Sequence, residues 1–279
     1  MTAGVPILID DAEDPRLADY RHLTDAAARA AVEAGADGCC IIEGVVALDR
    51  VLAAGVALRS VLVTPARAES SGPLLGRVPV DVPVLVAPRE LLADVTGFDV
   101  HRGVLASASR GPERSVAGLL GTARRVVVTE GINDHENLGS LFRNAAGTGV
   151  DAVLLDDRSA DPLYRRSIRV SLGWAAVLPH ARIGPLPEAF TALREAGFRV
   201  VALTPDAGAV PVDDAARSGL LDDRVALVVG AEGPGLTAAA RSGADALVRI
   251  PMPAGTDSFN VATSLAVVAA FAAARRDWA

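Results

Sequence analysis

Residues 225–236 read VALVVGAEGPGL, an apolar run of five residues followed by three glycines within six positions. The apolar run predicts a buried strand, and the glycines predict a loop whose backbone amides can approach a ligand closely. The glycine order is G-x-x-G-x-G, which differs from the G-x-G-x-x-G order of dinucleotide-binding folds. Glu232 stands inside the loop, where its charge would repel a phosphate. The loop therefore favours a cationic or hydroxyl-bearing ligand, although a tight surface turn has the same pattern.

Outside this stretch, apolar runs alternate with helix-like segments from end to end, which is typical of α/β domains. We predict a small α/β domain over residues 1–109, a Gly- and Pro-containing linker over 110–123 with a short helix at 115–120, and a second domain with a parallel sheet over 124–279. The strands expected are 39–43, 60–64, 82–87, 101–109, 125–129, 152–155, 175–178, 199–203, 225–229 and 246–250. The helices expected are 17–34, 45–54, 89–95, 138–148, 164–172, 187–196 and 260–275.

The bulk composition limits the class of protein. With 51% hydrophobic residues in 279, the chain can form real cores and is not intrinsically disordered. The longest apolar run, residues 261–274, is too short to cross a bilayer, and the start of the chain does not resemble a signal peptide. Cys39 and Cys40 are adjacent, and no Cys or His spacing suits zinc. We therefore expect a cytoplasmic protein with no bound metal and no membrane association.

The charge is negative and unevenly distributed. The net charge is −7, which argues against indiscriminate binding of nucleic acid. Residues 1–105 carry 9 arginines against 15 acids, a net charge of −6, and the remaining residues are nearly balanced. All 27 basic residues are arginine. Any nucleic-acid site must therefore be a local patch of arginines.

Two further motifs lie in the second domain. The first, NLGSLFRNAA at residues 137–146, places Asn137 as an N-cap, Gly139 where a close approach is possible, and Arg143 six residues after Asn137 in the same helix. The last, IPMP at residues 250–253 followed by DSFNV at 257–261, predicts a strand end, a short loop and the start of an apolar helix. Each motif alone is equally compatible with a capped helix.

Taken together, in this order and at these spacings, the three motifs resemble those of the SpoU (TrmH-like) branch of the SPOUT methyltransferase superfamily. In that branch the motifs are N-x-G-x-x-x-R-x-A, G-x-E-G-x-G, and I-P-M followed by S-L-N-V. Residues 161–171 are similar to ribosomal-RNA members, and residues 101–106, HRGVLA, are similar to the small substrate-binding domain of many relatives. Phe259 departs from the family pattern, in which leucine is usual.

The resemblance implies a fold and an activity. It implies a deep trefoil knot in the second domain, which is otherwise nearly absent from proteins, and an obligate homodimer with the sites close to the subunit interface. It also implies an enzyme that uses S-adenosylmethionine to methylate the ribose 2′-hydroxyl of RNA. The residues at the family's cofactor-binding positions are Thr204, Gly230, Gly235, Ile250, Met252 and Phe259.

The same resemblance assigns catalytic roles. Arg143 is expected nearest the ribose hydroxyl, and because a guanidinium is effectively always protonated, we expect it to stabilise the developing alkoxide and hold the adjacent phosphate. Glu232 is expected to orient Arg143 or meet the RNA, and Ser258 and Asn260 to position the ribose and the loop. For RNA contacts we expect Asn137, with a mostly structural role, and an arginine patch. The patch consists of Arg165, Arg166 and Arg169, whose other interpretation is a solvated helix face paired with Asp156, Asp157 and Asp161.

Several functions stay open at this level. Ribosomal RNA is favoured as substrate over transfer RNA by the extra first domain and by residues 161–171, and a drug-resistance methyltransferase of large-subunit RNA is a narrower version. A catalytically idle RNA-binding or assembly protein would keep the fold, but the retained Arg143, Glu232, Ser258 and Asn260 argue against it. A Rossmann dehydrogenase is disfavoured by the glycine order.

Overall fold

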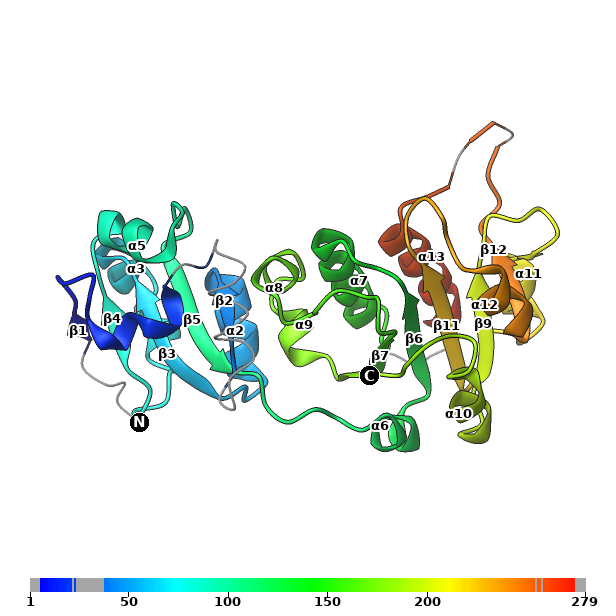
Figure 1. The fold of residues 1–279 in the computed structure, drawn as a ribbon, viewed down its shortest axis with the longest axis horizontal. Helices are drawn as coiled ribbons and strands as arrows, with labels where there is room; N and C mark the ends of the chain where they lie inside the picture. Colours follow the sequence, from blue (N-terminus) through cyan, green and yellow to red (C-terminus); the bar gives the residue numbers. More distant parts are fainter. Residues whose placement is uncertain (1–5, 22, 24–37, 254, 257, 274–279) are drawn as a thin grey trace. The chain divides into compact units, whose positions relative to one another are not determined.

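The computed structural model describes residues 6–21, 23, 38–253, 255–256 and 258–273. The chain forms two compact units, each built from a sheet and helices (Figure 1). The first unit comprises the residues up to Pro112 together with Leu163–Val177, and the second comprises Glu113–Pro162 together with the residues from Leu178 onward. The first unit thus contains a segment that lies, in the sequence, inside the predicted second domain.

The first unit has a five-stranded mixed sheet in the order β1-β4-β3-β5-β2. Strand β5 is antiparallel to both of its neighbours, and the other pairs are parallel. The strands are β1 (Ile7–Leu8), β2 (Cys39–Glu43), β3 (Leu58–Val63), β4 (Val84–Val86) and β5 (Val104–Ser109). Among the described residues before 100, the helices are η1 (Pro15–Tyr20), α2 (Val45–Ala53), α3 (Pro65–Ser70), α4 (Gly72–Leu75) and α5 (Arg89–Thr96). The helix predicted at 17–34 falls mostly on residues 24–37, outside the described residues.

The segment Leu163–Val177 carries helices α8 (Arg165–Val170) and α9 (Trp174–Val177). The strand predicted at 175–178 is wrong, because a short apolar run cannot be distinguished from a buried helical turn by periodicity alone. Gly173, at φ 89°, begins the turn and lies so close to α2 that a β-carbon on it would come within 3.1 Å of the Ala47 backbone. The strand instead follows Pro179, as β8 (His180–Arg182).

The second unit contains a seven-stranded sheet in the order β10-β12-β9-β11-β6-β7-β8, and every strand pair in it is parallel. This confirms the predicted parallel sheet. The central strands β6 and β11 are buried at nearly every position, and their middle residues are apolar, as expected where helices cover both faces. The other strands are β6 (Arg125–Glu130), β7 (Ala152–Leu155), β9 (Arg199–Leu203), β10 (Val210–Pro211), β11 (Val225–Gly230) and β12 (Ala246–Arg249).

Helices cover both faces of this sheet. On one face α6 (Val116–Thr122), α10 (Phe190–Glu195) and α12 (Ala238–Gly243) share a core with β6 and β11. Because Leu120 of α6 is buried in that core, α6 belongs to the second unit, and the connection is shorter than the predicted linker over 110–123. Helices α7 (His135–Gly147) and α13 (Val261–Ala273) pack side by side, and α13 also contacts β11 and α11 (Val212–Arg217) (Figure 1). No helix among the described residues is long and apolar enough to span a membrane.

Candidate cofactor and substrate site

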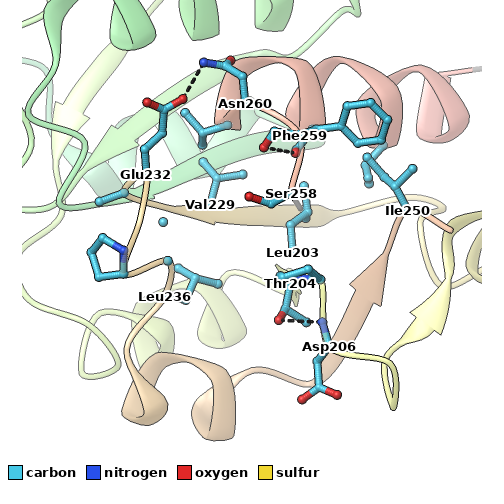
Figure 2. A pocket seen from close by; sticks show the side chains of 18 of the residues that line it. Leu203, Thr204, Asp206, Val229, Glu232, Leu236, Ile250, Ser258, Phe259 and Asn260 are labelled. Atoms are coloured by element: carbon cyan, nitrogen blue, oxygen red, sulfur yellow. Dashed lines mark hydrogen bonds between the residues drawn. The ribbon is translucent and has the colours of Figure 1, made fainter. Parts of the chain in front are cut away.

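A cavity of about 590 Å³ lies at the carboxyl ends of β9, β11 and β12, within the size range of small-molecule sites. Because these strands are parallel and adjacent, the loops that follow them meet at one edge of the sheet. The lining residues come from four stretches of the chain (Figure 2). These stretches are 203–206, 229–236, 248–252 and 258–261, supplemented by single residues of α12 and α13.

The cavity gathers nine of the ten residues predicted to be catalytic or cofactor-binding. All six predicted cofactor-binding residues line it, and three of the four predicted catalytic residues line it as well. The first group is Thr204, Gly230, Gly235, Ile250, Met252 and Phe259, and the second is Glu232, Ser258 and Asn260. The exception is Arg143, which does not line the cavity.

The glycine loop after β11 folds tightly back on itself. A β-carbon on Gly230 would stand 2.4 Å from both the carbonyl carbon of Gly235 and the amide nitrogen of Leu236, so only glycine fits there. The Gly235 amide donates to the Ala231 carbonyl at 3.0 Å, and Gly235 itself has a φ of 66°, a conformation that favours glycine. The two ends of the loop are therefore held together, and its backbone forms one wall of the cavity.

A buried carboxylate that the sequence motifs do not include holds this loop in place. Glu130, at the end of β6, is 2% exposed and accepts hydrogen bonds from the Thr237 amide at 2.8 Å and the Thr237 hydroxyl at 2.9 Å. Thr237 in turn caps α12, directly after the loop. The Glu130 carbonyl also accepts from the Ala231 amide at 3.0 Å. The available signal in the sequence was an acid at the end of a strand with an apolar centre, Val126–Val128.

Three side chains from the three motifs meet at one end of the cavity. The Asn260 amide nitrogen donates to the Asn137 side-chain oxygen at 2.7 Å and to a Glu232 carboxylate oxygen at 2.6 Å. Figure 2 shows Glu232 and Asn260 together at this end and Thr204 at the other. Hydrogen bonds to a charged group are the stronger kind, so Asn260 fixes the position of the carboxylate.

The helix caps differ from the predicted ones. Asp134 caps α7, since its carboxylate accepts from the amides of Glu136 and Asn137 at 2.9 and 2.8 Å. The interpretation of Asn137 as the N-cap is therefore wrong, and its side chain faces Asn260 instead. Asn260 caps α13 with its side-chain oxygen, which accepts from the Ala262 amide at 2.9 Å. Asn260 thus uses its oxygen for the helix and its nitrogen for the site.

Arg143 lies on the exposed side of α7, the helix that carries Asn137. Among the described residues it makes no hydrogen bond or ion pair. Its neighbour Asn144 donates to the Ala262 carbonyl at 2.7 Å, which joins α7 to α13 next to the site. The guanidinium is therefore free to meet a substrate, and the structure does not place it against Glu232.

The cavity has the chemistry of an adenosine-sized ligand site. Its walls combine apolar side chains with backbone groups of the glycine loop, and few charged side chains reach it. Thr204 is buried at its far end, where its hydroxyl accepts from the Asp206 amide at 3.3 Å. Glu232 supplies negative charge at the end occupied by Asn260, which suits a cationic group. The described residues contain no cluster of His, Cys, Asp or Glu arranged to hold a metal.

The three arginines predicted to contact RNA lie on α8, in the first unit. Arg165 is mostly buried, and it pairs with Glu43 at 2.9 Å rather than with Asp156, Asp157 or Asp161. Burial lowers the pKa of the Arg165 guanidinium, and Glu43 opposes that shift. Arg169 lies 3.9 Å from Glu43, and Arg166 is exposed. Arg165 therefore has a structural role that the sequence did not indicate.

Sheet topology and the position of the cavity define an α/β protein that binds a small ligand at the carboxyl ends of parallel strands. The chain belongs to the SpoU rRNA Methylase family, whose sequence profile matches residues 124–270. It is 47% identical over 258 residues to an uncharacterized tRNA/rRNA methyltransferase of Mycobacterium tuberculosis, covering 92% of this chain and 88% of that one.

The chain is also similar to a second methyltransferase in sequence and to a solved methyltransferase structure in fold. The chain is 31% identical over 185 residues to a 23S rRNA (guanosine-2′-O-)-methyltransferase of Burkholderia, covering 65% of this chain and 73% of that one. Its fold is similar to the crystal structure of an rRNA methyltransferase from Sinorhizobium meliloti with bound S-adenosylmethionine. That similarity has a TM-score of 0.76 at 22% identity, and it covers 95% of this chain and 97% of that one.

Proposed function

We propose that this protein transfers a methyl group from S-adenosylmethionine to a ribose 2′-hydroxyl of RNA, with ribosomal RNA as the substrate. The observation that carries the proposal is the hydrogen-bonded group of Asn137, Asn260 and Glu232 at the mouth of an apolar, glycine-walled cavity. Family membership supports the reaction class, and the Burkholderia relative's name supports the 2′-oxygen as acceptor.

The residues present fit S-adenosylmethionine. The apolar side chains of Leu203, Val229 and Ile250 offer a surface for adenine, and the backbone of the glycine loop offers hydrogen-bonding groups. Glu232, held by Asn260, offers negative charge toward a cationic group. When bound, the cofactor supplies a methyl group activated by a positively charged sulfur.

Arg143 and the hydrogen-bonded group around Asn260 have different roles in the methyl transfer. The ribose oxygen must be held about 3 Å from the methyl carbon and in line with the bond that breaks. Ser258 and Asn260, from the loop that enters α13, position the ribose. Arg143 stabilises the charge that develops on the 2′-oxygen and holds the neighbouring phosphate, and it does so as a guanidinium because it stays protonated.

The proposal includes a homodimer and a knotted chain. Arg143 is exposed beside α13, where Phe271 is 39% exposed and alanines allow close helix packing. A partner subunit on this face would bring a second copy of α7 and α13 near the site. The order of β9, β11 and β12, with α13 returning to pack on α7, supports a trefoil knot. Light scattering of the purified protein tests the dimer, and a monomeric mass would contradict it.

Ribosomal RNA is proposed over transfer RNA because the chain carries a separate first unit and resembles a 23S rRNA methyltransferase over 185 residues. Transfer RNA is the second candidate, since the Mycobacterium relative is named for both substrates. Methylation of such RNAs takes place in the cytoplasm, where we place the protein. A catalytically idle RNA-binding protein is the remaining alternative.

The test is methyl transfer from S-adenosylmethionine labelled in its methyl group. The protein is incubated with unmodified large-subunit ribosomal RNA or with transfer RNA, and the RNA is digested to nucleosides. We expect label in a 2′-O-methylated nucleoside from ribosomal RNA. Label in transfer RNA alone would favour the second candidate, label on a base would contradict the 2′-oxygen as acceptor, and cofactor binding without transfer would favour the idle protein.

A further inference from the structure

The first unit gathers arginines along one edge of its sheet. Because β2, β3 and β4 run in one direction and β5 runs in the other, the residues after β2, β3 and β4 lie at the same edge as those before β5. Each of these four strands brings an arginine there, either directly or through a contact. In the spatial order β4, β3, β5, β2 they are Arg89, Arg67, Arg102, and the pair Arg165 and Arg169, which contact Glu43 at the end of β2. We call these five residues the arginine edge.

The middle of the arginine edge is tightly built. Arg67, in α3, donates from Nε to the backbone carbonyl of Arg102, just before β5, at 2.9 Å, which joins the ends of two neighbouring strands. Arg102 covers Gly44, where a β-carbon would meet the Arg102 Cδ at 3.0 Å. A β-carbon on Gly103, at φ 63°, would approach the Thr64 hydroxyl to 2.8 Å. The two glycines therefore leave room for the arginine side chains that lie against them, Arg102 at Gly44 and Arg67 at Gly103.

The ends of the arginine edge are held by two acids. Arg89 forms two hydrogen bonds with Asp99, at 2.9 and 2.8 Å, and the neighbouring His101 is 81% exposed. At the other end, Arg165 pairs with the buried Glu43 and stacks over the Phe98 ring at 3.9 Å. These contacts orient the outer guanidiniums. They also leave five arginines against two contacting acids among the described residues.

Arg67 and Arg102 differ from most other arginines of the first unit. Four of those form ion pairs with acids of the same unit, as befits a domain with excess negative charge. The pairs are Arg16–Asp14, Arg21–Glu13, Arg59–Asp19 and Arg77–Asp49. Arg67 and Arg102 are exposed, the Arg67 side chain is bonded to the Arg102 backbone, and neither side chain makes an ion pair with the described residues. An exposed guanidinium group without a counter-charge can bind an anion through charge-assisted hydrogen bonds.

We propose that the arginine edge binds the phosphate backbone of the RNA substrate, with Arg67 and Arg102 making direct phosphate contacts. This rests on the proposed function, in which the substrate is RNA. Guanidinium groups bind phosphate oxygens through two parallel hydrogen bonds, and such contacts position a nucleic acid without reading its sequence. With strands about 4.8 Å apart, four strands span about 14 Å, so the row follows a stretch of backbone rather than a single phosphate.

The experiment compares the full-length protein with the variant Arg67→Gln/Arg102→Gln. Binding to a large-subunit ribosomal RNA transcript is measured as a function of salt concentration, and binding of S-adenosylmethionine is measured by calorimetry. Because each phosphate contact to single-stranded nucleic acid adds about 0.7 to the salt slope, two lost contacts should lower the slope by about 1.4 and the affinity by about 25-fold at 0.1 M salt. Cofactor affinity should be unchanged.

Two controls separate charge from folding. The variant Arg67→Lys/Arg102→Lys keeps both charges and should keep most of the RNA affinity. Arg77→Gln removes an exposed but ion-paired arginine of the same unit and should bind RNA like the wild type. Unchanged RNA affinity in the double glutamine variant would overturn the inference while leaving the proposed function standing, and so would an equal loss in the lysine variant. Failure of the wild type to bind the transcript would overturn both.

Discussion

The cavity of the second unit and the arginine edge of the first unit both lie at the ends of neighbouring strands, but they differ in the chemical groups that form them. The cavity is walled mainly by glycine backbone and apolar side chains, and only three charged residues, Asp206, Glu232 and Arg241, are among the described residues that line it. The arginine edge consists of guanidinium groups drawn from loops and helices around one sheet. We therefore assign recognition of the small cofactor to the second unit and recognition of the RNA backbone, a polyanion, to the first unit.

The largest effect on the methyl-transfer step itself should come from Arg143→Ala. Without the guanidinium the charge on the 2′-oxygen loses its stabilisation, which costs about 10²–10³-fold in turnover for comparable groups. Cofactor binding should be retained, because Arg143 does not line the cavity. Arg217→Ala, which removes an exposed arginine from α11, serves as the control and should keep full activity. Turnover and calorimetry measure the two effects, and an active Arg143→Ala enzyme would remove Arg143 from the mechanism.

Gly230→Ala should abolish cofactor binding, since the new β-carbon would overlap the backbone of Gly235 and Leu236. Relief of that overlap must move the loop that forms the cavity wall, at a cost of about 1–3 kcal/mol in stability. Gly147→Ala is the matched control, because a β-carbon there meets nothing within 4 Å. Calorimetry with S-adenosylmethionine and thermal unfolding give the readouts. Normal cofactor affinity in Gly230→Ala would mean that this loop does not form the cofactor site.

The two roles of Asn260 can be separated by two substitutions. Asn260→Asp keeps an oxygen for the Ala262 amide but loses the donor to Asn137 and Glu232. Two hydrogen bonds of about 1.5 kcal/mol each are lost and the new carboxylate repels Glu232, so the group is no longer held in place and turnover should fall by about 100-fold. Asn260→Ala should lose the helix cap too, about 1 kcal/mol in the free energy of unfolding. Equal turnover in Asn260→Asp and the wild type would show that the polar group is not used in catalysis.

The smallest effect on catalysis should come from Arg165→Gln. This change removes the hydrogen-bonded partner of the buried Glu43 and leaves it only Arg169, at 3.9 Å, which should lower the free energy of unfolding by about 2 kcal/mol. Turnover at saturating RNA should stay close to normal, because Arg165 lies in the first unit. Denaturant unfolding gives the stability, and the double variant Glu43→Gln/Arg165→Gln should recover part of the loss. A full loss in the double variant would mean that the ion pair itself is not the cause.

The two regions also differ in how much of them could be predicted. The cavity residues lie in short local motifs, so Gly230, Glu232 and Asn260 could be found from the sequence. The arginine edge could not be found, because Arg67 and Arg102 are 35 residues apart and meet only through the order of the strands. The same limit explains Glu130, whose partner Thr237 is 107 residues away. It also explains Asn137, which has the residue type of a cap but contacts Asn260, 123 residues away in the sequence.

The central claim, that the cavity of the second unit holds S-adenosylmethionine, is tested most directly by calorimetry of the purified protein with S-adenosylmethionine and, separately, with NADH. We predict stoichiometric binding of S-adenosylmethionine, loss of that binding in Gly230→Ala, and no heat from NADH. Absence of S-adenosylmethionine binding by the wild type, even with RNA present, would contradict the account and leave a protein that keeps the fold without the reaction.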